Sequence, residues 1–215
     1  MPKKRHTLTL LPLLPLFLAG CNMLGAAAYK IAGEPDVPAE FELPKKPTVV
    51  MVENFANADL AAADAEFIAQ RVQERLMAKD VVPVVRAEKI IELRGKGMSA
   101  FKKMTVKDVA KAVEAEQVLY VSFEAGGIGA IGGGSTLQGR TAVKVKVIDA
   151  VTGNTLWPQN ITDGRSVAFE TSPTDGTGTS PKDLRYKLYD GLAARVVRLF
   201  HKFKPSEQGE TAANG

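Results

Sequence analysis

The chain has 215 residues with 28 Lys+Arg and 24 Asp+Glu, which gives a formal net charge of +4. Three of these cations, Lys3, Lys4 and Arg5, stand among the first 20 residues, which hold no acid, so the remainder carries 25 basic against 24 acidic side chains. A nearly neutral chain gives no electrostatic reason to expect nucleic acid as a partner. Cys21 is the single cysteine, which excludes an internal disulfide and leaves stability to the core of the fold.

Residues 1–21 have the pattern of a bacterial lipoprotein signal peptide. The basic start is followed by an apolar run, Leu8 to Leu18, that is too short and too interrupted by proline to cross a bilayer as a helix. The next feature resembles the lipobox, where signal peptidase cuts before a lipidated cysteine, and consists of Leu18, Ala19, Gly20 and Cys21. An ordinary secretory signal with a chance cysteine is the alternative.

The lipobox resemblance implies that residues 1–20 are removed and that Cys21 carries palmitate and further acyl chains, which would hold the protein on a lipid bilayer. Asn22 follows the cysteine where an Asp would signal retention in some bacteria, which implies the outer membrane and a position facing the periplasm. Residues 21–46 are expected to form the lipidated cysteine and a flexible tether, because their prolines break any helix.

A single α/β domain is expected over residues 47–204, followed by a disordered tail at 205–215. It begins with a strand at Thr48–Val52, an unbroken apolar run typical of a strand covered on both faces. A helix to about Lys79 follows, and its charged side chains, including Arg71 and Arg75, lie mostly outside an apolar stripe. The next elements are an edge strand at Val81–Val85 and helices at Ala87–Arg94 and Thr105–Ala115.

The second half of the domain has the pattern of an antiparallel meander. Gln117–Glu124 and Arg140–Asp149 alternate apolar and polar residues and are predicted to pair. The remaining elements are a turn into Thr155–Trp157, a strand at Ser166–Glu170, a polar loop at Ser172–Ser180 and a helix from Pro181. We therefore expect an α/β (α+β) sandwich, with a mixed sheet and a C-terminal antiparallel meander covered by helices.

The sequence predicts no enzyme, no metal site and no cofactor. His201 is the one histidine beyond the predicted signal peptide. A base or a metal ligand is one interpretation of His201, but a cation that complements the end of the last helix is favoured. A lone histidine without a second histidine or a cysteine does not form a zinc site of the usual kind, nor a Ser-His-Asp constellation.

A glycine-rich stretch between the two long strands is the candidate contact site. Gly127 to Gly132 matches the G-x-G-x-x-G spacing, but it leads into a strand and not into a helix that could hold phosphate. A flexible hairpin tip is one interpretation, and a loop that contacts a partner or a membrane is the other. The residues of this predicted loop are Gly126, Gly127, Ile128, Gly129, Ile131 and Gly132.

The last predicted helix has a basic side. It consists of Lys182, Arg185, Lys187, Arg195, Arg198 and Lys202. A solvated helix face is the first interpretation, and contact with anionic lipid or a cell-wall polyanion is the second.

Several motifs, taken in order, are similar to a known group of periplasmic domains. They are Thr48–Phe55, Val81–Arg86, Ala115–Ser122 and Val145–Leu156. This order resembles the α/β domain of the curli-secretion lipoproteins, of the LpoB-type activators of penicillin-binding proteins and of the N-terminal part of TolB. The resemblance implies a fold and an envelope role, but no reaction. Pore formation is not implied, because Ala125–Ser135 lacks the 9–11 alternating residues of a membrane strand.

The function expected from the sequence is that of an outer-membrane-anchored periplasmic lipoprotein, a non-enzymatic adaptor or accessory subunit of an envelope assembly in cell-wall synthesis, transport or secretion. Its expected partners are the bilayer, through Cys21, and an envelope protein. A homo-oligomeric ring or secretion-channel component is an alternative, and a small-molecule-binding domain is a further one.

Overall fold

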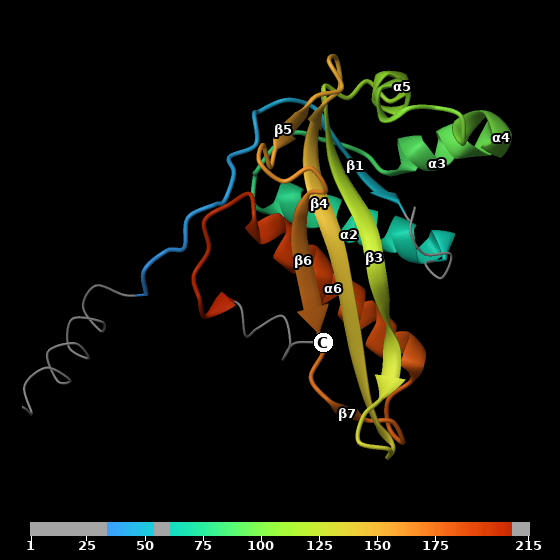
Figure 1. Ribbon diagram of the computed structural model, residues 1–215, viewed down its shortest axis with the longest axis vertical. Coiled ribbons are helices and arrows are strands. Elements are labelled where there is room, and N and C mark those ends of the chain that lie inside the picture. The colour runs from blue at the N-terminus through green and yellow to red at the C-terminus, as the bar shows by residue number, and fades with distance from the viewer. Residues whose placement is uncertain (1–33, 54–60, 208–215) are drawn as a thin grey trace, which may run out of the picture. The chain divides into compact units, whose positions relative to one another are not determined.

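The computed structural model describes residues 34–53 and 61–207 (Figure 1). It divides into two units, residues 1–36 and 37–215, and all the described helices and strands lie in the second. The predicted signal peptide, the lipobox and Cys21 lie outside the described residues. Within the described ranges, no helix is both long enough and apolar enough to cross a membrane.

One mixed sheet of seven described strands forms the centre of the second unit, with the order β2-β1-β3-β4-β5. Strand β1 is parallel to both of its neighbours, whereas β3 and β4 form a long antiparallel hairpin. Strands β5, β6 and β7 all pair antiparallel with β4. The bounds are β1 Thr48–Glu53, β2 Val84–Val85, β3 Gln117–Ala130, β4 Thr136–Asp149, β5 Thr155–Trp157, β6 Arg165–Glu170 and β7 Thr174–Asp175. The predicted mixed sheet with an antiparallel meander is therefore confirmed.

Two long helices, α2 (Ala62–Ala78) and α6 (Pro181–Arg198), cover one face of the sheet (Figure 1). Alternate strand residues such as Val121, Phe123 and Val145 bury their side chains against them. The predicted apolar stripe of α6 is buried from Leu184 onward, because residues three and four apart share one side of a helix.

Three shorter helices cover the other face at the β1 end of the sheet. They are α3 (Glu88–Gly95), α4 (Met98–Phe101) and α5 (Val106–Ala112). The Thr105 hydroxyl accepts from the backbone N–H of Asp108, and the Asp108 carboxylate accepts from the backbone N–H of Thr105, so α5 begins with a capping box. The sequence did not predict α4, whose single turn has no periodic pattern.

The hairpin of β3 and β4 is longer than predicted. Residues 126–129, expected in a loop, are paired across the hairpin with residues 138–141. Glycine still carries a backbone donor and acceptor, so it can continue the hydrogen-bonded ladder of a sheet. Because it has no side chain, it adds nothing to the apolar alternation from which a strand is predicted. The turn is confined to residues 131–135, where Gly132 and Gly133 have φ values of +65° and +70°.

The folded unit begins before residue 47, which corrects the predicted boundary of the tether. Residues 37–43, here called the strap, lie against the end of α6. Val37 exchanges backbone hydrogen bonds of 2.7 and 3.1 Å with Phe203, and Glu40 and Phe41 both donate to the Leu199 carbonyl, at 2.8 and 3.0 Å. Leu43 is only 6% exposed. The strap was predicted as part of the tether because Pro38 and the neighbouring prolines exclude a helix. Proline does not prevent an extended segment from packing on the fold.

Side chains hold the strap as well. Arg165 makes a bidentate ion pair with Glu40, with N–O distances of 2.8 and 2.9 Å. Phe41 stacks on Trp157 at a ring-centroid distance of 6.0 Å, and Trp157 contacts Phe200 edge-on at 5.6 Å. The strap therefore fixes the segment that follows α6.

The predicted disordered tail begins with an ordered turn at residues 204–207. The backbone N–H of Glu207 donates to the Lys204 carbonyl at 3.0 Å. The rest of the predicted tail, residues 208–215, lies outside the described part of the chain.

Candidate functional site

The predicted glycine loop is divided between a strand and a turn. Ile128 and Ile131 are partly buried. Gly126 has a packing role, because a Cβ there would lie 2.6 Å from Cζ of Phe123 and 2.8 Å from Oγ1 of Thr141. Gly127 and Gly129 face open space. No metal-ligand cluster of His, Cys, Asp and Glu occurs here or elsewhere in residues 34–53 and 61–207.

The two adjacent glycines are expected to respond differently to substitution. Gly126→Ala should lower the free energy of unfolding by about 1–2 kcal/mol, because the added methyl group overlaps a buried ring. Gly127→Ala, which meets no atom within 4 Å, is the matched control and should leave it nearly unchanged. Urea unfolding measures both, and equal midpoints would contradict the packing role.

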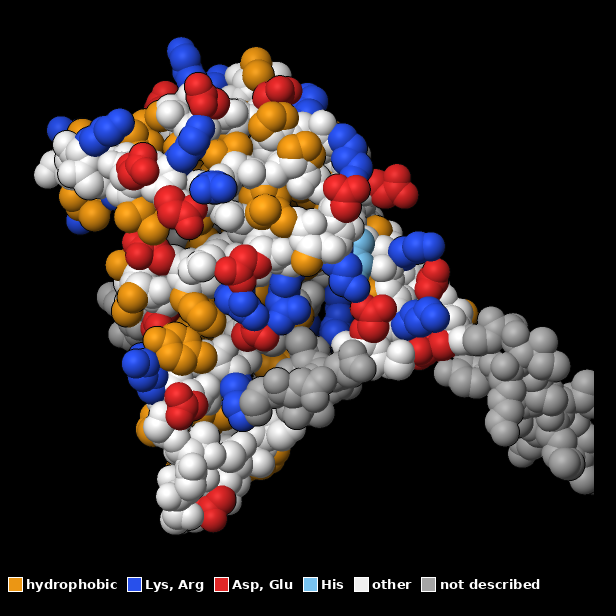
Figure 2. Space-filling view, turned by 180° about the vertical axis from the view of Figure 1, so that it is seen from behind, with side chains coloured by type: hydrophobic (Ala, Val, Ile, Leu, Met, Phe, Trp, Pro, Cys, Tyr) orange, Lys and Arg blue, Asp and Glu red, His pale blue; other side chains and the backbone are white. Residues whose placement is uncertain are grey.

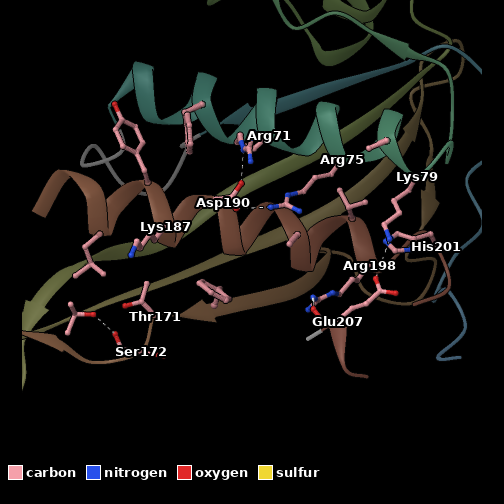
Figure 3. Close-up of a pocket in the computed structure, with 18 residues that line it drawn as sticks. Arg71, Arg75, Lys79, Thr171, Ser172, Lys187, Asp190, Arg198, His201 and Glu207 are labelled. Carbon is pink, nitrogen blue, oxygen red and sulfur yellow. Dashed lines mark hydrogen bonds and ion pairs between the residues drawn. The ribbon is translucent and has the colours of Figure 1, made fainter. Parts of the chain in front are cut away.

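A groove over α6 has a volume of about 700 Å³ (Figure 3). Helix α2 forms one wall, and the segment from β6 to β7 forms the other. Figure 2 shows Lys and Arg side chains gathered around this hollow. The groove is lined by Phe67, Arg71, Arg75, Ala78, Lys79, Phe169, Thr171, Ser172, Thr174, Leu184, Tyr186, Lys187, Asp190, Ala194, Val197, Arg198, His201 and Glu207.

An ionic brace joins the two helices in the middle of the groove. Asp190 of α6 accepts from Nε of Arg71 at 2.6 Å and from Nη2 of Arg75 at 2.7 Å, both on α2 (Figure 3). Arg71 also pairs with Glu74 at 2.5 Å. The hydrogen bond to Asp190 raises the pKa of the Arg71 guanidinium. The ion pairs between α2 and α6 fix the spacing of the two helices. The brace adds little net charge to the groove, because its two cations and two carboxylates balance.

The end of the groove beside the strap holds Lys79 and Arg198. Lys79 pairs with Glu207 at 3.2 Å, and Arg198 donates to the backbone carbonyl of Glu207 (Figure 3). Burial lowers the pKa of Arg198, and the neighbouring Arg195 lowers it further. The second effect is repulsion between like charges, which indicates that cations crowd together here. We name Lys79 and Arg198 the cationic clamp.

His201 lies at this end of the groove but shows no catalytic partner among the described residues. Its Nδ1 lies 2.7 Å from the backbone carbonyl of Lys202, and its ring contacts Phe203 edge-on at 6.4 Å. Both contacts are with residues beyond the end of α6, so the interpretation of His201 as a cation that complements the helix end stays a prediction.

Aromatic and hydroxyl side chains complete the walls of the groove. Phe67 and Tyr186 lie with ring centroids 4.9 Å apart, and Tyr186 is 41% exposed. Thr171 accepts from the backbone N–H of Gly139 at 2.9 Å, which ties this wall to β4. The arrangement offers cations beside apolar surface and can bind an anionic group that carries an apolar part.

The structure brings together only part of the predicted basic side of α6. Lys187 and Arg198 line the groove, and Arg195 lies over the Phe169 ring at 5.5 Å. Arg185 instead pairs with Asp64 at 3.8 Å. Sequence reasoning missed the contribution of α2, whose Arg71 and Arg75 were placed on a solvated side. Their spacing of four residues was the one available signal that they share a helix face.

No protein-family model and no curated protein sequence matches this chain. Among solved structures, it is similar to the lipoprotein GNA1162 from Neisseria meningitidis, at 13% identity and a TM-score of 0.45 over 66% of this chain and 90% of that chain. It is also similar to the PelC dodecamer from Paraburkholderia phytofirmans, at 15% identity and a TM-score of 0.42 over 78% and 96%. The LpoB C-terminal domain from Salmonella enterica matches at 17% identity and a TM-score of 0.37 over 67% and 91%. These likenesses assign neither a function nor a partner to this chain.

Proposed function

We propose that this chain is a lipid-anchored protein of a bacterial cell envelope, attached to the outer membrane through Cys21 and facing the periplasm. Its α/β domain acts as a non-enzymatic accessory subunit that binds a protein partner. The observation that carries the partner-binding part is the groove over α6, where arginine, lysine and aromatic side chains surround one concavity.

The anchor rests on the sequence of the lipobox and on the position of the folded unit. Val37, where the strap begins, follows Cys21 by 16 positions. An extended chain spans at most 3.3–3.6 Å per residue, so the domain can stand up to about 55 Å from the anchored cysteine. Such a tether raises the local concentration of a weak binder beside its partner.

The side chains of the groove suit a protein interface. Arginine and tyrosine are enriched among the residues that dominate the binding energy of protein interfaces. Tyr186 is exposed on the rim, and Arg75 is braced by Asp190 in the wall. Preorganised side chains lose less conformational entropy on binding than free ones.

A small organic anion is a second candidate ligand. The cavity volume of about 700 Å³ lies within the usual range of small-molecule sites, about 300–1,000 Å³. A rise in melting temperature with a small anion, without any captured protein, would favour this candidate.

Palmitate labelling and crosslinking in intact cells test the proposal. The full chain should incorporate labelled palmitate and, after crosslinking and detergent extraction, co-purify with a different envelope protein. Cys21→Ser should lose the label and most of the partner, whereas the matched control Asn22→Ser, one position further on, should keep both. Crosslinks only between copies of this chain would support a homo-oligomer instead and would contradict the accessory role.

A further inference from the structure

The cationic clamp already holds one acidic residue, and that residue belongs to the same chain. The Glu207 carboxylate accepts from Lys79 at 3.2 Å, while Arg198 donates to the Glu207 backbone carbonyl (Figure 3). Side chain and backbone of one glutamate are therefore bound together. A free carboxylate or phosphate ion would satisfy Lys79 but would offer Arg198 no peptide carbonyl.

The neighbours of Glu207 favour its charged form. Burial raises the pKa of Glu207, but the hydrogen bonds from Lys79 and from the backbone of Lys204, together with the nearby cations, lower it to below its ordinary value. Arg195 and Lys187 lie on the same helix as Arg198. Cations that converge on a concave surface attract anions more strongly than the same cations on a flat one.

The contact of Glu207 is open to exchange. The side chains of Lys79 and Glu207 are 49% and 37% exposed, and exposed ion pairs add little to stability. Glu207 ends the described part of the chain in a short turn. A second glutamate of comparable chemistry could replace it without disturbing the sheet or the brace between α2 and α6.

We propose that the groove binds an acidic peptide segment of the protein partner, and that Glu207 occupies the place of one of its carboxylates until the partner arrives. This inference rests on the proposed function and specifies the chemistry of the partner. The clamp of Lys79 and Arg198 binds a glutamate or aspartate of the peptide together with its backbone carbonyl. The exposed ring of Tyr186 gives the peptide an apolar contact at the other end of the groove.

Fluorescence anisotropy of labelled hexaglutamate tests this inference on the full chain in detergent micelles at low salt. The expected result is saturable binding of hexaglutamate and none of hexaglutamine. Arg198→Gln should weaken binding by about tenfold, the usual size of a lost charge-assisted hydrogen bond. Lys79→Gln should weaken it by about threefold, because the Lys79 side chain is more exposed. Lys103→Gln removes one charge from an exposed site outside the groove and should change binding little. Glu207→Gln should strengthen binding, because it removes the resident competitor.

Four outcomes would overturn the inference. Equal weakening by Lys79→Gln and Lys103→Gln would show attraction by net charge alone. If inorganic phosphate displaced hexaglutamate completely when both supply the same concentration of negative charge, the groove would be a general oxyanion site. Binding that appears only after deletion of residues 208–215 would show that this segment of the same chain is the occupant. A partner captured in cells without hexaglutamate binding would retain the proposed function and reject only the acidic peptide.

Discussion

Replacement of Gly191 by alanine is expected to lower the free energy of unfolding by about 2 kcal/mol. Gly191 lies in the middle of α6 where this helix crosses β6. An alanine Cβ there would overlap the ring of Phe169 and lie 2.8 Å from its Cε2 atom. Phe169 is only 5% exposed, so moving its ring aside would disrupt its packing. The steric cost should exceed the gain of about 1 kcal/mol that alanine brings to a helix interior.

A second glycine provides the control for helix propensity. Gly95 ends α3, and a Cβ there meets no atom within 4 Å. Gly95→Ala should therefore be neutral or slightly stabilising in the same urea titration. Phe169→Leu should recover part of the loss in the Gly191→Ala background, because it shortens the obstructing side chain. A Gly191→Ala variant as stable as the parent would contradict the close packing of α6 on β6.

Replacement of Leu43 by alanine is expected to cost about 3 kcal/mol, the usual size of a large-to-small change in a core. Leu43 is 6% exposed and belongs to the same core cluster as α2 and α6. The loss would show that the strap is part of the folded unit. A truly flexible tether would lose nothing when one of its leucines is shortened.

Glu42, the neighbour of Leu43, supplies the matched control. Its side chain is exposed, so Glu42→Ala should change the free energy of unfolding by less than about 0.5 kcal/mol. Equal effects of Leu43→Ala and Glu42→Ala would contradict the packing of the strap. Thermal unfolding followed by circular dichroism distinguishes these results.

The strap also connects the predicted anchor with the proposed binding site. It hydrogen-bonds to Leu199 and Phe203, the segment that directly follows Arg198 of the clamp. His201 of the same segment lines the groove. Loss of the strap is therefore expected to disturb the clamp before it disturbs the brace between α2 and α6.

Periodic apolar side chains explain why most of the fold was predictable from the sequence. Apolar residues at every second position, Leu119, Val121 and Phe123, predict the strand β3. Apolar residues at every fourth position, Leu184, Leu188 and Leu192, predict the helix α6. The alternation ends at Gly126, because three of the next four paired residues of β3 are glycines, at positions 126, 127 and 129. Strand β7 has two residues, too few for any periodicity.

The groove was harder to predict because its residues are distant in sequence. Asp190 is 115 positions from Arg75 in the sequence, so no local pattern predicts their ion pair. The basic side of α6 was visible, but its partner wall on α2 was not. The sequence pattern of a charged helix face is the same whether that face is exposed to solvent or lines a groove.

Site-specific photocrosslinking in living cells tests the central claim, that the groove over α6 is the partner interface. A photoreactive amino acid at Tyr186, on the groove, is compared with one at Val151, which is 73% exposed and does not line the groove. The expected result is a crosslink from position 186 to one other envelope protein, with none from position 151. No crosslink from position 186, or the same protein captured from both positions, would contradict the claim.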